Sequence, residues 1–344
     1  MRNELKIVLV IIGTLIGAGF ISGQEMYTFF YVYGIKGILG LFICSVLVSY
    51  VVYKTFTIVK HENITNYKEF LDVFKKNNEK KYLNFAYVTN IIINIFLFIT
   101  FCIMVAGFGA YFSQEININS MIGSLLFAII TFIALKRDVK GIVKLNQILV
   151  PIIIIFVTLI GIFNFQNINL YNIQKSTQNS YIGWIVGSVL YSSYNLILLI
   201  PVLITLRKYI NTKKEIKNTA IITSVVVLLL TITLFLLLSR IESGIETIEM
   251  PTAYAIAQYL PYFRKIYGII ILISIFTTAI SLGISFLENI SKNKKSYTQT
   301  AIIMFIISVI LSRIGFSNLI NLLYPIFGIL GLMQIKNIIF YKLY

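Results

Sequence analysis

The sequence alternates between long apolar runs and short polar stretches that hold most of its charged residues. An α-helix of about 20 residues crosses the roughly 30 Å of hydrocarbon in a bilayer, because it rises about 1.5 Å per residue. The pattern therefore predicts an all-α polytopic membrane protein. Its ten predicted spans are residues 6–33, 36–59, 83–113, 119–136, 141–164, 179–206, 216–239, 262–288, 297–314 and 317–339.

Composition supports this class. Hydrophobic residues make up 58% of the chain and charged residues only 12%, and the mean hydropathy is +0.87. These values lie outside the range of soluble globular domains, so we expect a single integral membrane domain. The first apolar run lacks a small-residue cleavage site and continues into EMYTFFYVYG, and we interpret it as a retained span.

The 29 lysine and arginine residues give a formal net charge of +16. Most of them fall in the loops on one side of the predicted spans, which predicts a multi-pass plasma-membrane protein with both termini in the cytoplasm. Anionic lipid headgroups account for this positive surface, so we expect the lipid bilayer and no nucleic acid as its partner. The basic residues on the opposite side are Lys36, Lys175, Arg240, Arg264, Lys265 and Arg313.

Two segments between the spans have patterns of their own. Residues 60–82 include apolar positions at helical spacing and predict a helix on the inner membrane surface. Residues 240–261 hold three acids and a short helical piece between Pro251 and Pro261, which is too short to span and predicts an outer cap.

Candidate catalytic chemistry is sparse. Cys44 and Cys102 lie in apolar runs, where a thiol behaves as a small hydrophobe, and His61 has no Cys or His nearby. This leaves no metal-ligand cluster and no Ser-His or Cys-His pair, so we expect neither an enzyme nor a bound cofactor.

Ten spans divide into two sets of five, at residues 1–165 and 176–344, and an odd number per set gives the halves opposite orientations. The first spans of the two halves can be aligned, IGTLIGAGFI at 12–21 with VGSVLYSSYN at 186–195. Glycines and small hydroxyl residues in mid-membrane weaken a helix, so this inverted repeat predicts that helices 1 and 6 are both discontinuous and enclose a binding site. The alternative is that Gly13 and Gly17 only allow close helix packing.

These residues resemble a known superfamily. The G-x-x-x-G-x-G spacing of Gly13, Gly17 and Gly19 is similar to the unwound first helix of amino acid, polyamine and organocation (APC) transporters with the leucine-transporter (LeuT) fold. More narrowly, GAGFISGQE followed by FF and YG resembles the YkvI-like membrane proteins. The resemblance implies secondary transport of a small-molecule substrate, with Na⁺ or H⁺ as the coupling ion.

The resemblance also implies site residues. The N–H groups of Ala18 and Gly19 match those that hold a substrate carboxylate, and Phe101 closes the apolar side unless it only packs. The full substrate set is Gly17, Ala18, Gly19, Phe20, Phe101, Tyr191, Ser192, Ser193 and Asn195. A sodium site would use the carbonyls of Gly13 and Ile16 with the hydroxyls of Ser274, Thr277 and Thr278, although these hydroxyls can instead bond their own helix. Gly23 replaces the outer gating arginine of the LeuT branch, and Phe20 replaces a sodium-binding asparagine.

Glu25 has two interpretations. An intramembrane carboxyl is a candidate for proton or cation coupling, or for pairing with a substrate ammonium. Alternatively, SGQE forms a capping box in which Ser22 begins the outer half-helix and Glu25 reaches back to it.

We therefore expect a secondary active transporter that moves a small amino acid or related zwitterion by alternating access. The alternative is an amino-acid sensor of the spore germinant receptor type, which uses the same fold without coupled transport. A channel is less favoured, because no charged ring or filter is present in the sequence.

Overall fold

The computed structural model describes residues 3–74, 79–135, 140–174, 178, 180–291 and 293–342. In this part of the chain all regular structure is helical. The α-helices are α1 (Asn3–Leu15), α2 (Ala18–Ile21), α3 (Gln24–Phe29), α4 (Ile35–His61), α5 (Tyr67–Val73), α6 (Glu79–Ile116), α7 (Ser120–Leu135), α8 (Lys140–Asn164), α9 (Leu170–Gln174), α10 (Gly183–Leu206), α11 (Lys213–Leu238), α12 (Pro251–Tyr259), α13 (Arg264–Ile290), α14 (Lys294–Leu311) and α15 (Phe316–Phe340). Short 3-10 turns cover Tyr31–Tyr33, Phe165–Asn167, Arg207–Tyr209, Ile245–Thr247, Pro261–Phe263 and Ser312–Ile314.

The predicted spans correspond to these helices. Eight of the helices in the described residues are long and apolar enough to cross a membrane. The predicted fourth span is the shorter apolar helix α7, and the predicted first span is divided among α1, α2 and α3. The prediction of an all-α polytopic membrane protein is confirmed. The division into repeats at 1–165 and 176–344 stays a prediction, and residue 176 itself lies outside the described residues.

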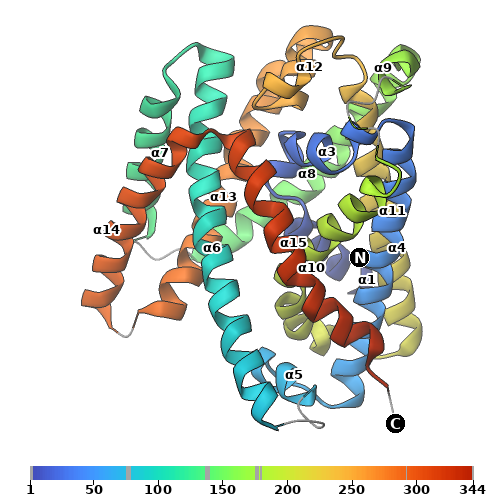
Figure 1. The fold of residues 1–344 in the computed structure, drawn as a ribbon, viewed down its shortest axis with the longest axis vertical. Coiled ribbons are helices and arrows are strands. Elements are labelled where there is room, and N and C mark those ends of the chain that lie inside the picture. The colour runs from blue at the N-terminus through green and yellow to red at the C-terminus, as the bar shows by residue number, and fades with distance from the viewer. Residues whose placement is uncertain are drawn as a thin grey trace.

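Helix α10 lies in the middle of the bundle (Figure 1). It packs most extensively against α15 and α4, and it also contacts α1 and α3. Helices α6, α7 and α14 lie together on one side, and α4 and α11 pair on the other. Residues of α10 can therefore meet the divided first span on one face and α15 on the other.

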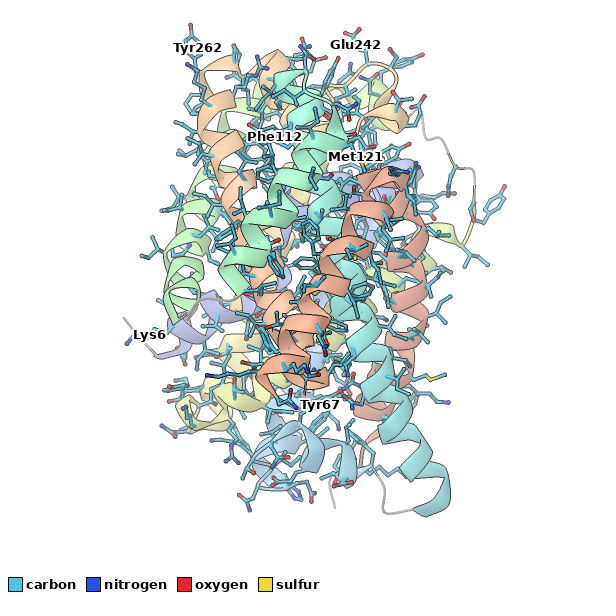
Figure 2. The ribbon with its side chains drawn as sticks, turned by 90° about the vertical axis from the view of Figure 1, so that its left-hand side faces the viewer. Lys6, Tyr67, Phe112, Met121, Glu242 and Tyr262 are labelled. Carbon is cyan, nitrogen blue, oxygen red and sulfur yellow. The ribbon has the colours of Figure 1, made fainter. Side chains whose placement is uncertain are left out.

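The two ends of the bundle differ. The end with α9 and α12 is called the outer end, following the charge-based prediction, and the end with α5 the inner end (Figure 1). The side chain of Asn218, near the start of α11, donates to Glu4 at 3.1 Å, and the Tyr341 hydroxyl lies 2.8 Å from Glu62 at the end of α4. The C-terminal end of the described chain thus lies at the inner end, and Figure 2 shows Lys6 in the same half of the molecule as Tyr67, opposite Glu242 and Tyr262.

Small residues allow the central helices to approach closely. A Cβ at Gly37 of α4 would lie 2.0 Å from the carbonyl oxygen of Phe30, and one at Gly331 of α15 would lie 2.6 Å from that of Ser193. Without a hydrophobic driving force between helices in lipid, such backbone contact is a main source of helix association. The centre of the bundle therefore depends on glycine.

Helix α5 packs its apolar face against protein, whereas its predicted place at the inner membrane surface stays a prediction. Phe70 is fully buried, and the side-chain nitrogen of Gln334 on α15 donates to the Tyr67 hydroxyl at 2.7 Å. Phe74 packs edge-on against Tyr341, with ring centroids 5.5 Å apart. The apolar face of α5 is used to close the inner end of the bundle against protein instead of lipid.

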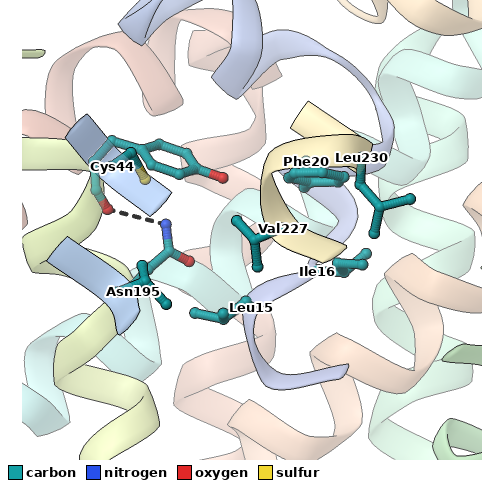
Figure 3. A pocket seen from close by; sticks show the side chains of 9 residues that line it. Leu15, Ile16, Phe20, Cys44, Asn195, Val227 and Leu230 are labelled. Atoms are coloured by element: carbon teal, nitrogen blue, oxygen red, sulfur yellow. Dashed lines mark hydrogen bonds between the residues drawn. The ribbon is translucent and has the colours of Figure 1, made fainter. Parts of the chain in front are cut away.

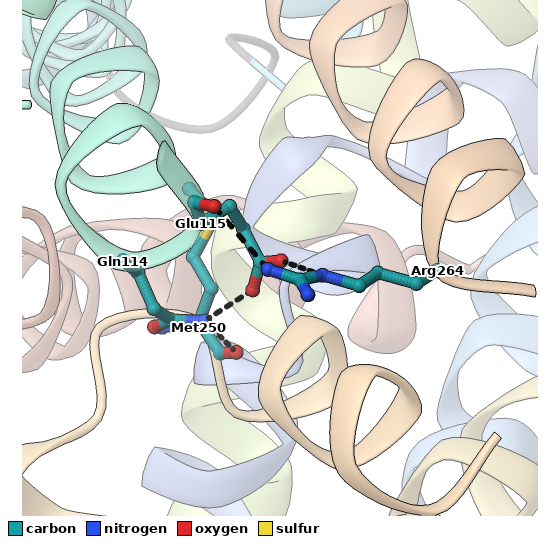
Figure 4. Close-up of polar contacts among 4 residues, drawn as sticks. All are labelled: Gln114, Glu115, Met250 and Arg264. Carbon is teal, nitrogen blue, oxygen red and sulfur yellow. Dashed lines mark hydrogen bonds and ion pairs between the residues drawn. The ribbon is translucent and has the colours of Figure 1, made fainter. Parts of the chain in front are cut away.

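The predicted short helix after Pro251 is α12, which lies at one end of the bundle, and its place on the outer side stays a prediction. The residue before α12, Met250, makes two hydrogen bonds with the side-chain amide of Gln114 near the end of α6. Gln114 accepts from the N–H of Met250 at 3.0 Å and donates to its carbonyl at 3.2 Å. Beside it, Arg264 at the start of α13 pairs with Glu115 at 2.9 Å (Figure 4). The cap, α6 and α13 are thus tied together at the outer end.

The prediction that the sixth span is discontinuous is wrong. Helix α10 is continuous from Gly183 to Leu206. The hydroxyls of Ser192 and Ser193 donate to the carbonyls of Ser188 at 2.8 Å and Val189 at 2.6 Å, so these small polar side chains are satisfied within the helix. Pro201 removes one N–H donor farther along without ending the helix.

Candidate functional site

The first span is broken in the middle, as predicted. Helix α1 ends at Leu15, and α2 begins at Ala18 after an extended Gly17 with φ −95° and ψ −178°. In the described residues, no hydrogen-bond partner meets the N–H groups of residues 17–20 or the carbonyls of residues 13–16. These are the groups that two helix ends leave free, and at mid-membrane depth they need partners from a polar cavity or a ligand.

A tight turn follows the break. Gly23 has φ +80°, in the left-handed region that favours glycine, and it precedes α3. The Ser22 hydroxyl donates to the carbonyl of Gly19 at 2.8 Å and accepts weakly from the N–H of Gln24 at 3.3 Å. The N–H of Ser22 donates to Ala18, so the predicted capping box with Glu25 does not form.

The outer cap holds this turn in place. The N–H of Thr252 on α12 donates to the Ser22 carbonyl at 3.0 Å, and the Thr252 hydroxyl donates to that of Ile21. The hydroxyl of Tyr267 on α13 donates to the same Ile21 carbonyl at 2.5 Å. Two carbonyls near the end of α2 are therefore bound by the two elements that lie outside it.

A small pocket lies beside the break (Figure 3). The divided span supplies one wall and α10, α4 and α11 supply the others. Apolar side chains dominate, and the polar groups come from α10. The lining residues are Leu15, Ile16, Phe20, Cys44, Val48, Tyr191, Asn195, Val227 and Leu230.

Asn195 is the amide of the pocket. Its side-chain nitrogen donates to the carbonyl of Tyr191 at 3.0 Å, one turn earlier in α10. This bond fixes the amide, and its oxygen lies on the side of Val227 (Figure 3), although the exposed surface of the pocket itself is apolar. An oriented amide oxygen accepts hydrogen bonds and can receive them from a ligand ammonium.

The structure brings some of the predicted substrate residues together. Phe20, Tyr191 and Asn195 line the pocket beside Ile16, a predicted sodium ligand, and open space lies beside Gly17. The other predicted substrate residues do not line the pocket, and their roles stay predictions. Ala18 and Gly19 are buried just past the break, Ser192 and Ser193 bond their own helix, and Phe101 packs beside Gly283 of α13.

No described contact joins the predicted sodium ligands of the first span to those of α13. A Cβ on Gly13 would lie 2.7 Å from the side chain of Val150, so this glycine allows close packing against α8. Ser274 has a buried hydroxyl without a partner, whereas the Thr277 hydroxyl lies 3.3 Å from the carbonyl of Ser274 and Thr278 is half-buried. The free carbonyls of Gly13 and Ile16 remain available, and the sodium site stays a prediction.

Glu25 turns back toward the break. A Cβ at Gly19 would lie 2.3 Å from Oε1 of Glu25, so the carboxyl rests directly on this glycine. The side chain is buried, and the phenols of Tyr191 and Tyr194 face it. Oε2 of Glu25 and the Tyr194 hydroxyl are both buried and make no hydrogen bond of regular geometry in the described structure.

Sequence reasoning missed several residues at this site. Cys44, Val48, Val227 and Leu230 carry no signal beyond their place in apolar runs. Tyr194 lies in the aligned VGSVLYSSYN segment, and Tyr324 precedes Pro325 in the last span, so a search for polar side chains near helix-weakening residues could have found both.

No protein-family model matches the chain. Two relatives are from Bacillus subtilis (strain 168). The uncharacterized membrane protein YkvI is 28% identical over 95% of this chain and 92% of its own, and the uncharacterized protein YyaD is 26% identical over 99% of this chain and 98% of its own.

Solved transporters share the architecture. MhsT, in complex with L-phenylalanine, superposes with a TM-score of 0.59 at 18% identity, over 96% of this chain and 87% of its own. A mutant of the manganese transporter of Eremococcus coleocola gives 0.61 at 11% identity, over 98% and 78%. The chain has the LeuT fold. This confirms the architecture implied by the glycine spacing, and these structural neighbours are transporters and not enzymes.

Proposed function

We propose that this LeuT-fold protein is a secondary active transporter that moves a small amino acid with an apolar side chain by alternating access. The observation that carries the proposal is the break in the first span, whose unpaired N–H groups lie next to an apolar pocket with one oriented amide oxygen. A gradient of Na⁺ or H⁺ drives the transport. The protein lies in the plasma membrane with both termini in the cytoplasm.

The carboxylate, the ammonium group and the side chain of an amino acid each have a complementary group at or beside the break in the first span. Unpaired N–H groups of Ala18 and Gly19 suit a carboxylate, because they donate without competing bonds. The Asn195 oxygen suits the ammonium group. The aliphatic side chains of Leu15, Val227 and their neighbours suit an apolar side chain. MhsT, which shares the fold, is described in complex with L-phenylalanine.

The proposal is tested with the purified protein and a set of L-amino acids that includes leucine, isoleucine, valine, phenylalanine, serine and glutamate. A ligand that binds the native state raises the melting temperature, and we expect the apolar members to do so. Uptake of the same amino acids into proteoliposomes should follow. Binding without uptake under either ion gradient would favour the sensor alternative, and the absence of any binding would contradict both.

Asn195→Leu is expected to weaken binding of L-leucine about 10- to 100-fold, because a hydrogen bond to a charged group contributes about 1.5–3 kcal/mol. Isothermal titration calorimetry measures the change. The matched control is Asn318→Leu, since the Asn318 side chain also donates to its own helix, at 2.9 Å from the Ile314 carbonyl, but lies at the outer end of α15. Equal affinities for the Asn195 variant and the wild type would show that the Asn195 amide does not bind the ligand.

A further inference from the structure

Several polar groups lie between the outer end of the bundle and Glu25. Asn321, on the outer part of α15, is exposed, and its side-chain oxygen lies 2.5 Å from the Thr28 hydroxyl and 3.4 Å from the side-chain nitrogen of Gln24. Gln24 is only 1% exposed, and its Oε1 has no partner. Gln24 and Thr28 thus carry polar contacts from the edge of the bundle to α3.

The same path continues through two tyrosines. Tyr324 lies one helical turn beyond Asn321 on α15, and its ring is 4.7 Å from that of Tyr194 on α10. Tyr194 in turn faces Glu25, with its buried hydroxyl toward the carboxyl. These residues, Asn321, Thr28, Gln24, Tyr324, Tyr194 and Glu25, are called the outer polar path.

Gln24 Oε1 is buried and unpartnered, and Glu25 Oε2 and Tyr194 OH, from two residues that face each other, are buried and make no hydrogen bond of regular geometry in the described structure. Buried polar atoms almost always have hydrogen-bond partners, so three such atoms along one path require an explanation. One explanation is that these atoms exchange hydrogen-bonding partners when the protein functions. The packing of α3, α10 and α15 alone does not use these atoms.

No basic side chain compensates the carboxyl. In the described part of the chain, the ionisable groups that face Glu25 are Tyr191 and Tyr194 from α10 and Tyr324 from α15. Helices α11 and α12, which also contact α3, bring no ionisable group to it. A buried carboxylate without a counter-charge is costly, and either a proton or a metal cation would remove its charge.

The surroundings favour the proton. A bound metal cation needs a cavity walled by several oxygens. Around Glu25 the rings of Phe29, Tyr191 and Tyr194 pack with centroids 5.4–5.7 Å apart, and the pocket lining includes Tyr191 but not Glu25. A proton occupies no cavity, and amide and hydroxyl groups with water can pass it along.

We propose that the coupling ion is H⁺, that it enters from the outer end along the outer polar path, and that Glu25 carries it. This rests on the proposed function, because it names the ion that drives that transport. A proton from outer water forms an O–H bond with the Glu25 carboxylate. When the site opens inward, this bond breaks and the proton passes to water on the inner side.

The contact with Gly19 links the proton to the substrate. Oε1 of Glu25 rests on Gly19, whose N–H is one of the unpaired donors at the break. A charged carboxylate repels a substrate carboxylate brought to that N–H, and a neutral carboxyl does not. Proton binding therefore precedes or accompanies substrate binding, as coupling requires.

The first measurement needs no substrate. Infrared difference spectra of the purified protein between alkaline and acidic pH should show the C=O band of a protonated buried carboxyl, and Glu25→Gln should lose it. The control Glu242→Gln, which removes an exposed acid at the outer end, should keep it. Absence of the band in the wild type, or its persistence in Glu25→Gln, would overturn the proposal.

The second measurement uses L-leucine uptake into proteoliposomes without Na⁺. With one proton per solute, an interior one pH unit more alkaline should drive about tenfold accumulation, because one unit corresponds to about 1.36 kcal/mol. The Glu242→Gln protein should behave like the wild type, and Glu25→Gln should equilibrate without accumulation. Asn321→Leu should slow the pH-driven uptake several-fold while keeping the infrared band, since it blocks entry and not the carrier.

The outcomes separate the two proposals. Wild-type uptake that depends on the Na⁺ gradient and not on the pH gradient would rule out H⁺ as the coupling ion. It would still support the proposed transport. Loss of L-leucine binding in Glu25→Gln would make the carboxyl a ligand for the substrate ammonium and overturn the carrier role. Wild-type protein that takes up none of the amino acids would contradict the proposed function itself.

Discussion

Gly19→Leu is expected to abolish amino-acid binding while the protein remains folded. Its Cβ would lie 2.3 Å from Oε1 and 3.0 Å from the carboxyl carbon of Glu25, so the Glu25 side chain must leave its place. The new side chain also fills the approach to the unpaired N–H groups at the break. Since each charge-assisted bond contributes about 1.5–3 kcal/mol, the affinity for L-leucine should fall by more than about a hundredfold.

The clash involves the end of a flexible side chain, so a folded variant is expected. Gly17→Ala is the matched control for folding, because no atom lies within 4 Å of the added Cβ and Gly17 has negative φ. Size-exclusion chromatography and the melting temperature establish folding, and calorimetry measures binding. A Gly19→Leu protein that binds L-leucine as the wild type does would show that the ligand does not use this backbone.

Gly37→Ala is expected to destabilise the whole bundle. The added Cβ would lie 2.0 Å from the carbonyl oxygen and 2.7 Å from the carbonyl carbon of Phe30, which are backbone atoms and cannot rotate away. Helix α4 would have to move away from the segment after α3, at a cost of about 1–3 kcal/mol or more. The melting temperature of the purified protein should fall by about 5 °C.

Gly40→Ala provides the comparison one turn along the same helix. The nearest atom to its Cβ is the Ser188 hydroxyl oxygen at 2.5 Å, which can turn to another rotamer. We expect a smaller loss than for Gly37→Ala. Equal melting temperatures for Gly37→Ala and the wild type would mean that the contact between α4 and Phe30 is not needed for stability.

The spans could be predicted because the bilayer constrains them so strongly. A segment must be apolar and about 20 residues long to cross, whatever it packs against, and this requirement is visible in a single sequence. The break in the first span was visible for a similar reason. Four glycines within Gly13–Gly23 cannot sustain an uninterrupted helix without a strong packing reason, and Gly23 adopts a positive φ.

The sixth span shows the limit of the repeat argument. Its aligned segment has serines where the first span has Ala18 and Gly19, and a serine can remain helical by bonding the carbonyl four residues earlier. The alignment treats glycine and serine as equivalent small residues. Glycine and serine differ in how well they sustain a helix, and only the glycine-rich segment is interrupted.

The residues of the site were harder to predict than its position. Phe101 and Phe96 lie on the same helix within two turns, yet Phe101 packs toward α13 whereas the Phe96 ring lies 6.4 Å from that of Tyr194. Hydrophobicity is the same for both, and only the rotation of α6 in the bundle distinguishes them. Likewise, Tyr324 and Asn321 meet α3 across nearly the full length of the chain, which no local pattern encodes.

The bonds from Thr252 and Tyr267 to the carbonyls of Ile21 and Ser22 have a mechanical consequence. The half of the first span beyond the break cannot tilt unless the cap tilts with it or these hydrogen bonds break. Tyr262 lies just past the cap and is 93% exposed. Any such rocking would therefore move a residue that is in contact with bulk solvent. A fluorophore attached there would serve as an external gauge of events buried in mid-membrane, readable without labelling the site itself.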